Sequence, residues 1–145
     1  MMGKWNEKGF TMIEMLLVLS IMMVATSSII FVATSKLEEV EEKRFFRQFH
    51  LDMQRLQAIA IGEYKYTYMN FDENGSKYVA KNANVPLFEL KLPDHLRLST
   101  DSYLKGITFH PNGTVSQFGT FLFETRNGPK TVTVYIGRGR LKYEE

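Results

Sequence analysis

Apolar residues are concentrated in one block near the start of the chain. After nine mostly polar residues the sequence is almost entirely apolar up to Ser35, and no charge occurs between Glu14 and Lys36. About 20 helical residues span roughly 30 Å, the thickness of the hydrocarbon core of a bilayer. The 21 uncharged residues between Glu14 and Lys36 therefore predict a transmembrane helix within residues 10–35.

A second apolar pattern follows, with a helical period. Its members recur every three or four residues, which places them on one helix face that we expect to pack on a sheet: Phe45, Phe49, Met53, Leu56 and Ala60. Charged residues on the other positions predict a solvated or subunit-facing surface: Glu38, Glu39, Glu41, Glu42, Lys43, Arg44 and Arg47. Because no Gly or Pro lies between Phe10 and Gly62, one helix is expected to run through both patterns and end near Gly62.

Beyond the helix the sequence predicts short strands separated by turns. Alternation and β-branched or aromatic residues mark strands at 64–71, 76–81, 87–92, 106–110, 119–124, 130–136 and 138–143. Gly, Asn and Pro clusters between several of them predict tight turns, which join strands in antiparallel order. We therefore expect an α+β fold: a long N-terminal helix, transmembrane in its first half, packed by its second half on an antiparallel β-sheet. The expected parts are a leader (1–9), the membrane half of the helix (10–35) and a globular domain (36–145).

The position of Glu14 separates three interpretations of the apolar block. A carboxylate in hydrocarbon costs about 2.5–3.5 kcal/mol unless it finds a partner, so an ordinary membrane anchor offers no reason for this residue. A secretory signal has an apolar region of only about 7–15 residues followed by small residues, and this block is longer. The third interpretation, a precursor, comes from a resemblance that the residues around Glu14 carry.

The residues around Glu14 support the third interpretation. The segment Lys8-Gly9-Phe10-Thr11-Met12-Ile13-Glu14 resembles the type IV prepilin signature. The resemblance implies cleavage between Gly9 and Phe10 by a prepilin peptidase, and N-methylation of the new Phe10 amine. It also implies that Glu14 serves assembly by meeting the amine of a neighbouring subunit. Such a pair is far less costly than either buried charge alone.

Residues in the C-terminal third narrow the resemblance to one group of pilin-like proteins. Residues 107–113, 119–121 and 133–141 resemble GspH/FimT-like pseudopilins, and above all the ComGD-type competence pseudopilins of Gram-positive bacteria. This implies a minor pseudopilin of a competence pseudopilus needed for DNA uptake in transformation. A minor pilin or pseudopilin of a type IV pilus or a type II secretion system is the alternative within the same class.

The resemblance also implies partners and a location. The partners are other pseudopilins of the same system, the prepilin peptidase and membrane lipid before assembly. The N-terminus is expected in the cytoplasm, because the leader carries Lys4 and Lys8. The chain would cross the cell membrane once, with the C-terminal domain outside, and reach the cell surface after assembly.

A different class, a membrane-tethered DNA-binding module, stays open. Arg138, Arg140 and Lys142 alternate in the last predicted strand, so all three could contact phosphates from one face. A charged edge strand that discourages aggregation is the alternative explanation, and we expect DNA contact by this chain to be indirect. Three tyrosines at 64, 66 and 68 could stack bases, but packing against the helix or a neighbouring strand is the favoured interpretation.

Enzyme chemistry has little support in the sequence. His50, His95 and His110 are isolated, outside any HExxH pairing, and are expected at the surface or in turns. The sequence contains neither a GxSxG elbow nor a Gly-rich phosphate loop. With no cysteine, disulfides and thiolate metal sites are excluded, and a net charge of +2 gives no strongly basic field. We expect a structural protein without catalytic residues, metal or cofactor.

Overall fold

The computed structural model describes residues 11–135 and 141–144, without side-chain detail at 32–35 and 141–144. The chain divides into two compact units, Met1–Glu39 and Val40–Glu145, which are described separately below. A single helix, α1 (Met12–Glu63), passes through both. The unbroken helix expected from the absence of Gly and Pro is thus observed, and it ends one residue beyond Gly62.

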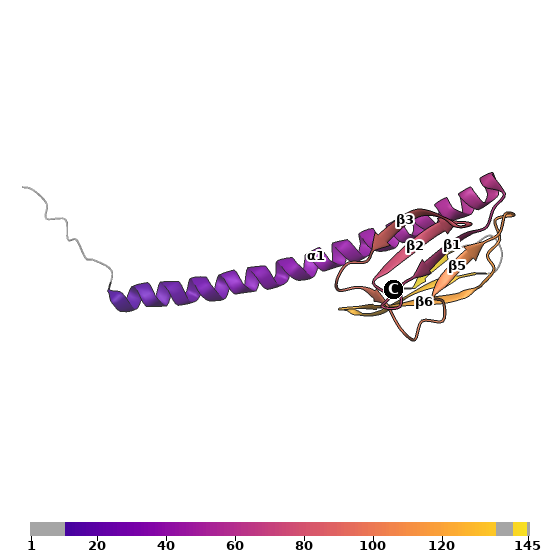
Figure 1. The fold of residues 1–145 in the computed structure, drawn as a ribbon. Coiled ribbons are helices and arrows are strands. Elements are labelled where there is room, and N and C mark those ends of the chain that lie inside the picture. Colours follow the sequence, from indigo (N-terminus) through magenta and orange to yellow (C-terminus); the bar gives the residue numbers. More distant parts are fainter. Residues whose placement is uncertain (1–10, 136–140, 145) are drawn as a thin grey trace, which may run out of the picture. The chain divides into compact units, whose positions relative to one another are not determined.

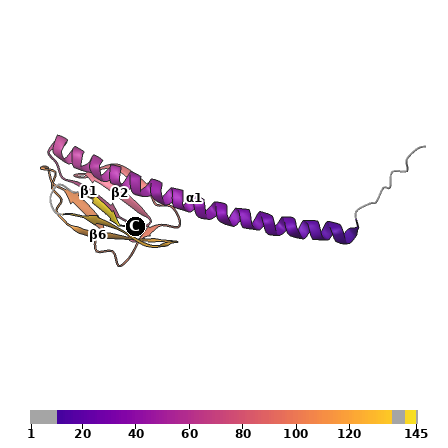
Figure 2. The ribbon, with the colours of Figure 1, turned by 180° about the vertical axis from the view of Figure 1, so that it is seen from behind.

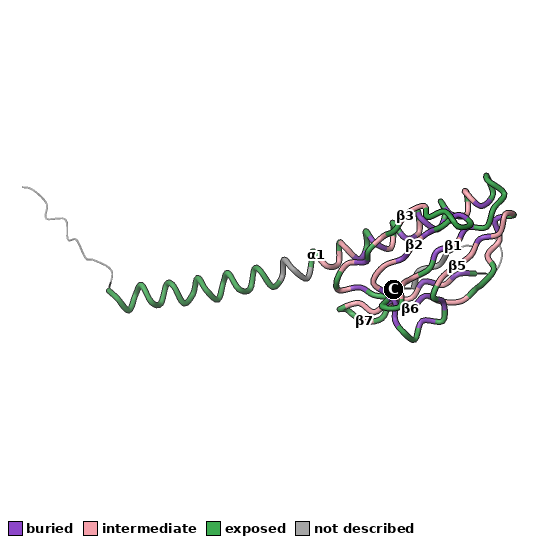
Figure 3. Tube along the Cα trace, viewed as in Figure 1, coloured by how far each residue is buried: buried purple, intermediate pink, exposed green. Residues whose placement is uncertain are grey.

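The first unit is helical and exposed. Every side chain described between Thr11 and Phe31 is exposed, as the green tube of Figure 3 shows for this part of α1. Most are large and apolar: Met12 is 83% exposed and Phe31 is 74% exposed. An apolar surface that the chain itself leaves uncovered must be covered by lipid or by another protein.

Among its described residues, the second unit contains eight strands in two antiparallel sheets. The strands are β1 (Thr67–Phe71), β2 (Lys77–Asn82), β3 (Val85–Lys91), β4 (Arg97–Leu98), β5 (Gly106–Phe109), β6 (Gly119–Thr125), β7 (Gly128–Val134) and β8 (Leu141–Glu144). One sheet has the order β3-β2-β1-β5 and the other the order β4-β6-β7-β8. The expected fold class is confirmed. The division into two sheets, and the two-residue strand β4, were not foreseen.

The second half of α1 packs on these strands through the predicted apolar face. Figures 1 and 2 show this part of the helix lying along the strands in both views. All five residues of the face are buried at 4% exposure or less, which confirms the prediction. Both sheets contribute to the same core, through Met69 and Ile107 from one and Phe121 and Val132 from the other.

Phe49 is the centre of an aromatic cluster that joins helix and sheets. Its ring is fully buried and lies 5.7 Å from the ring of Tyr78 on β2, 5.6 Å from Phe121 and 5.8 Å from Phe123 on β6, measured between centroids. These contacts are close to edge-to-face, the arrangement that ring quadrupoles favour by about 0.5–1.5 kcal/mol per pair. One helix residue thereby packs against both sheets.

The end of α1 differs from the sequence-based prediction. A strand was expected from Tyr64, but β1 begins at Thr67. Tyr64 has φ of 56°, and the N–H of Lys65 donates to the carbonyl oxygen of Ala60 at 3.2 Å. This left-handed residue closes the helix in the manner of a C-terminal cap. The three residues that precede β1 therefore belong to the cap and the turn.

A backbone hydrogen bond at Gly75 connects the two sheets. Gly75 lies in the β1–β2 turn with φ of 65°, and its carbonyl oxygen accepts a 2.9 Å hydrogen bond from the N–H of Leu98 on β4. A Cβ at this position would overlap the backbone of Leu98. Glycine is required here both by the positive φ and by the close approach of two backbones.

Candidate functional site

Glu14 lies in the first turn of α1, immediately after a helix cap. The N–H of Glu14 donates to Oγ1 of Thr11 at 3.3 Å, and the N–H of Met15 donates to the carbonyl oxygen of Thr11 at 3.1 Å. Thr11 therefore acts as the N-cap, and an acid in the first turn is favoured by the positive end of the helix. The Glu14 side chain is exposed, so it is accessible to a group from outside the chain.

The other residues of the processing motif lie outside the described residues. This holds for Gly9, the expected cleavage residue, and for Phe10, the expected methylated terminus. Their roles, like that of Glu14, stay predictions.

The segment after Glu14 has the length and composition of a membrane span. An 18-residue window of α1 has a mean hydropathy of 2.5 and is not buried inside the chain. The hydroxyls of Ser20, Thr26, Ser27 and Ser28 donate to carbonyl oxygens four residues earlier at 2.7–2.9 Å. Self-bonded hydroxyls expose less polarity to an apolar environment, so these residues do not oppose insertion.

The expected row of basic residues near the C-terminus is described only in part. Arg138 and Arg140 lie outside the described residues, and so does the side chain of Lys142. The backbone of Lys142 belongs to β8 and pairs with Thr133 on β7. Whether the three side chains share a face stays a prediction.

Glu42 corrects the prediction of a solvated charged surface on α1. Its side chain is fully buried, with Oε2 at 3.2 Å from Nζ of Lys130 on β7 and Oε1 at 4.0 Å from Nε2 of His95. Glu42 precedes Phe45 by three residues, so it lies on the apolar face. Other charged residues of this surface, such as Lys43, Arg44 and Arg47, are exposed as expected.

His95 lies in a turn, as predicted, between Pro93 and Leu96, where the N–H of Leu96 donates to the carbonyl oxygen of Pro93 at 2.9 Å. The His95 side chain is only 14% exposed, and Nδ1 lies 3.7 Å from Oε2 of Glu41. His95 and Lys130 contact carboxylates on α1 from two different elements. The group of four therefore connects the helix to β7 and to the segment between β3 and β4.

A second buried polar contact joins α1 to β2. The hydroxyl of Tyr78 donates to Oδ2 of Asp52 at 2.6 Å, and Nε2 of Gln48 donates to Oδ1 of the same carboxylate at 2.9 Å. Burial, together with the hydrogen bond and the negative charge of Asp52, raises the pKa of Tyr78 above its usual value of 10.0. The contact fixes the helix on the sheet because its two ends have no access to water.

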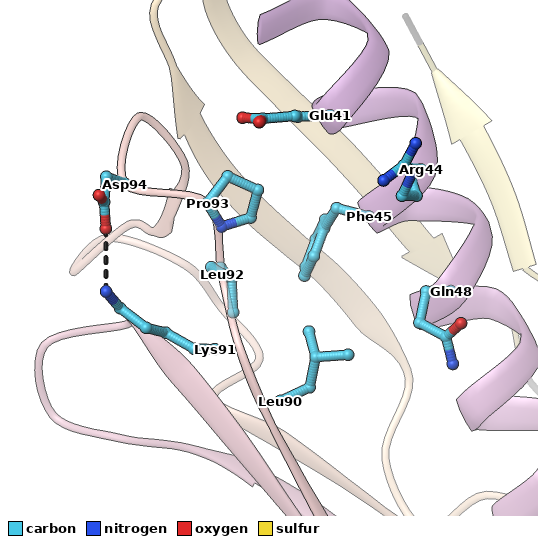
Figure 4. A pocket seen from close by; sticks show the side chains of 9 residues that line it. All are labelled: Glu41, Arg44, Phe45, Gln48, Leu90, Lys91, Leu92, Pro93 and Asp94. Carbon is cyan, nitrogen blue, oxygen red and sulfur yellow. Dashed lines mark hydrogen bonds and ion pairs between the residues drawn. The ribbon is translucent and has the colours of Figure 1, made fainter. Parts of the chain in front are cut away.

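A shallow groove lies between α1 and the segment after β3. Figure 4 shows its lining, with the apolar side chains of Phe45, Leu90 and Leu92 at the base. At its edge Nζ of Lys91 donates to Oδ1 of Asp94 at 3.0 Å, a hydrogen bond that lowers the pKa of Asp94. The volume is about 560 Å³. Its apolar base and the charge pair at its edge are the features that the groove offers to a binding partner.

The tyrosines near the start of β1 are less buried than expected. Tyr64 is 82% exposed and Tyr66 is 51% exposed, while Tyr68 is half-buried. The ring of Tyr66 lies 5.1 Å from that of His110, edge to face. Packing against a neighbouring element is therefore observed for Tyr66, and the same expectation is wrong for Tyr64.

Within the part of the chain that the structure describes, no three His, Asp or Glu side chains gather as a metal site requires. The charged clusters described above pair acids with bases across element boundaries. The candidate site that the sequence predicts is the exposed helix surface that begins at Glu14.

Comparisons with known proteins find matches to the N-terminal segment and to the fold. Residues 6–30 match the family described as "Prokaryotic N-terminal methylation motif". Two crystal structures of the type IV minor pilin FimU of Pseudomonas aeruginosa have a similar fold. One has a TM-score of 0.54 at 17% identity and covers 68% of this chain and 89% of FimU. The other has a TM-score of 0.56 at 16% identity and covers 79% and 92%.

The chain thus combines the methylation motif at residues 6–30 with the fold of a type IV minor pilin. Within that class the chain is similar to the competence protein ComGD of Streptococcus pneumoniae, with 27% identity over 93% of this chain and 78% of ComGD. These findings support a role as a minor pilin or pseudopilin.

Proposed function

We propose that the chain is a minor pseudopilin of a competence pseudopilus that takes part in DNA uptake during transformation. The observation that carries the proposal is the similarity to ComGD, which extends over 93% of the chain and thus includes the globular domain as well as the methylation motif. The proposal further requires a membrane-held precursor, since a fibre of this kind draws its subunits from the lipid bilayer.

The precursor is cleaved after Gly9 and methylated at Phe10. Residues 6–30 match the methylation motif, and this range contains Gly9, Phe10 and Glu14. Cleavage would place a new amine four residues before the exposed Glu14. During assembly the Glu14 carboxylate would meet the terminal amine of a neighbouring subunit, which offsets the cost of both charges in an apolar surrounding.

Before assembly the apolar part of α1 lies in the cell membrane, with the leader in the cytoplasm and the globular domain outside. The exposed apolar surface from Met12 to Phe31 and the two lysines of the leader support this orientation. After assembly the same apolar surface would be covered by other subunits, and the globular domain would reach the cell surface. The partners are the other pseudopilins of the system, the prepilin peptidase and membrane lipid.

The fold of FimU supports a second candidate, a minor pilin of a type IV pilus. The two candidates differ in phenotype. Removing the chain from its host should lower transformation strongly and leave surface motility and protein secretion unchanged if the competence proposal is right. Loss of motility or secretion with normal transformation would favour the second candidate instead.

Maturation provides the direct biochemical test. Mass spectrometry of the protein isolated from cells should find a chain that begins at N-methylated Phe10. A chain that still begins at its first methionine, or one that starts beyond the apolar block, would contradict the proposed processing.

Direct DNA binding by Arg138, Arg140 and Lys142 can be tested on the detergent-solubilised full chain. The gel shift of a DNA fragment would be compared between the chain and its Arg138→Ala/Arg140→Ala variant. Because phosphate contacts depend on cations, a shift that the variant loses would make the chain a DNA-binding module. We expect no such shift, since DNA contact is proposed to be indirect.

A further inference from the structure

Both ring nitrogens of His95 face carboxylate oxygens of α1. Nδ1 lies 3.7 Å from Oε2 of Glu41, and Nε2 lies 4.0 Å from Oε1 of Glu42. A neutral imidazole carries a single N–H, so one of its two nitrogens directs a lone pair at a carboxylate. The imidazolium carries two N–H groups, and it is therefore the form that two facing acceptors match.

Two atoms of this contact are buried without a hydrogen-bond partner among the described residues. They are Nε2 of His95 and Oε1 of Glu42, which face each other at 4.0 Å. An N–H···O hydrogen bond is about 2.9 Å long, so a movement of about 1 Å would join the two atoms once Nε2 carries a proton. One proton would thus satisfy two buried polar atoms that are costly when left unpaired.

The charges that contact His95 favour its protonated form. Glu41 and Glu42 contribute two negative charges from α1, and Lys130 on β7 contributes one positive charge, 3.2 Å from Oε2 of Glu42. Because these three charges sum to −1, a proton on His95 brings the group of four to neutrality. Burial of the ring, which is 14% exposed, and the Lys130 ammonium oppose this proton. Two carboxylates, one at each ring nitrogen, outweigh one ammonium at the other oxygen of Glu42.

Other charged groups near His95 lie at a polar cavity of about 370 Å³ that His95 lines together with Asp94, Arg97, Glu124 and Arg126. Asp94 accepts a hydrogen bond from Nζ of Lys91 at 3.0 Å. Nε of Arg97 on β4 donates to Oε2 of Glu124 on β6 at 2.6 Å. These two acids are thus engaged by other bases, and the carboxylates that face the imidazole nitrogens are those of α1.

We propose that His95 is a pH-sensitive clamp that tightens the packing of α1 on the globular domain when its ring gains a second proton. The protonated ring connects Glu41 and Glu42 of the helix to the segment between β3 and β4. The neutral ring can donate to only one of the two carboxylates. The inference concerns packing within the chain, so it does not depend on which fibre the chain enters.

The direction of the effect follows from proton binding. The folded chain holds the proton between two carboxylates, whereas unfolding exposes the ring to water. A folded state that binds more protons than the unfolded state gains stability as the pH falls. Since an imidazole changes charge between about pH 8 and about pH 5, the packing of α1 tightens as the medium becomes more acidic across this range.

Denaturant unfolding of the detergent-solubilised full chain at about pH 7.5 and about pH 5.5 tests the clamp. We expect the unfolding midpoint of the unaltered chain to shift to higher denaturant at the lower pH, relative to His95→Gln, which cannot take up the proton. Glu41→Gln removes the carboxylate that faces Nδ1 and should lose most of this shift. His110→Gln is the matched control and should keep it, because the half-buried His110 ring lies against Tyr66, 5.1 Å between centroids.

Side-chain ¹H–¹⁵N NMR of the unaltered chain reads the protons on the ring directly, so the test stays decisive even where a variant does not fold. At about pH 5.5 both nitrogens of His95 should carry a proton, and the Nε2–H should be protected from exchange with water. A ring with a single proton at this pH would overturn the clamp. So would an unaltered chain whose midpoint depends on pH in the same way as that of His95→Gln.

Discussion

Oε2 of Glu42 on α1 lies 3.2 Å from Nζ of Lys130 on β7, and the carboxylate is fully buried. A buried charge is tolerated when its counter-charge is close, and removing one partner leaves the other unpaired in an apolar surrounding. The packing of α1 on the sheets therefore depends on a residue that lies 88 positions later in the chain.

The first prediction concerns this pair. Lys130→Met should lower the free energy of unfolding by about 3 kcal/mol, because it leaves the buried Glu42 carboxylate without its counter-charge. This value is at the low end for a broken buried pair, since the Lys130 side chain is 28% exposed. The double variant Glu42→Met/Lys130→Met should be close to the unaltered chain, since no buried charge is left without a partner. Denaturant unfolding of the detergent-solubilised chain measures both. Equal losses in the single and double variants would contradict the role of the charge.

A second prediction uses the buried hydroxyl of Tyr78. Its raised pKa means that above pH 10 the unfolded chain releases this proton while the folded chain keeps it. Stability is therefore complete below pH 10 and falls at higher pH, by up to about 1.4 kcal/mol per pH unit. Tyr78→Phe should remove this part of the alkaline slope. It should also cost about 2 kcal/mol at neutral pH, because Asp52 loses a hydrogen bond.

Denaturant unfolding at pH 7 and between pH 9 and pH 11 would measure both effects of Tyr78→Phe. If the variant keeps the same alkaline slope as the unaltered chain, the slope does not come from Tyr78.

The third prediction addresses cleavage. Gly9→Leu should accumulate as uncut precursor, because a bulky side chain at the scissile bond blocks access to the backbone. Gly9→Ala is the matched control and should retain more processing. Gel mobility and the intact mass of the protein report the outcome. Normal maturation of Gly9→Leu would contradict the predicted cleavage after Gly9 by a prepilin peptidase.

The fourth prediction separates processing from assembly at Glu14. Glu14→Val should be cut and methylated as usual but should be largely absent from fibres, because no carboxylate meets the amine of the neighbouring subunit. Ile13→Val, at the adjacent and also exposed position of the helix, is the control and should assemble normally. Quantitative immunoblots of isolated fibres against whole membranes measure incorporation. Wild-type incorporation of Glu14→Val would count against the pairing.

Much of the fold could be predicted from the sequence, since periodicity is a local signal. The spacing of Phe45, Phe49 and Met53 identified the buried face of α1, and the absence of Gly and Pro predicted one unbroken helix. The division of the strands into two sheets was not predictable in the same way. It depends on long-range pairs such as Leu98 on β4 with Phe123 on β6. Strand β4 has only two residues, which are too few to show a periodic pattern in the sequence.

The burial of Glu42 could have been predicted from its spacing, but the acidic residues around it favoured the opposite interpretation. Glu42 lies in a run of acidic residues, which favoured a solvated surface, yet its three-residue spacing from Phe45 continues the apolar face. The partner that makes its burial tolerable, Lys130, comes from β7. No local pattern reveals that contact.

The close approach of Gly75 to Leu98 has a mechanical consequence. In the proposed fibre a subunit would experience tension, and strands of separate sheets can slide apart under such a load. The hydrogen bond between these two backbones ties a turn of one sheet to an edge strand of the other, so both sheets must yield together. A side chain at position 75 would weaken resistance to pulling far more than its small size suggests.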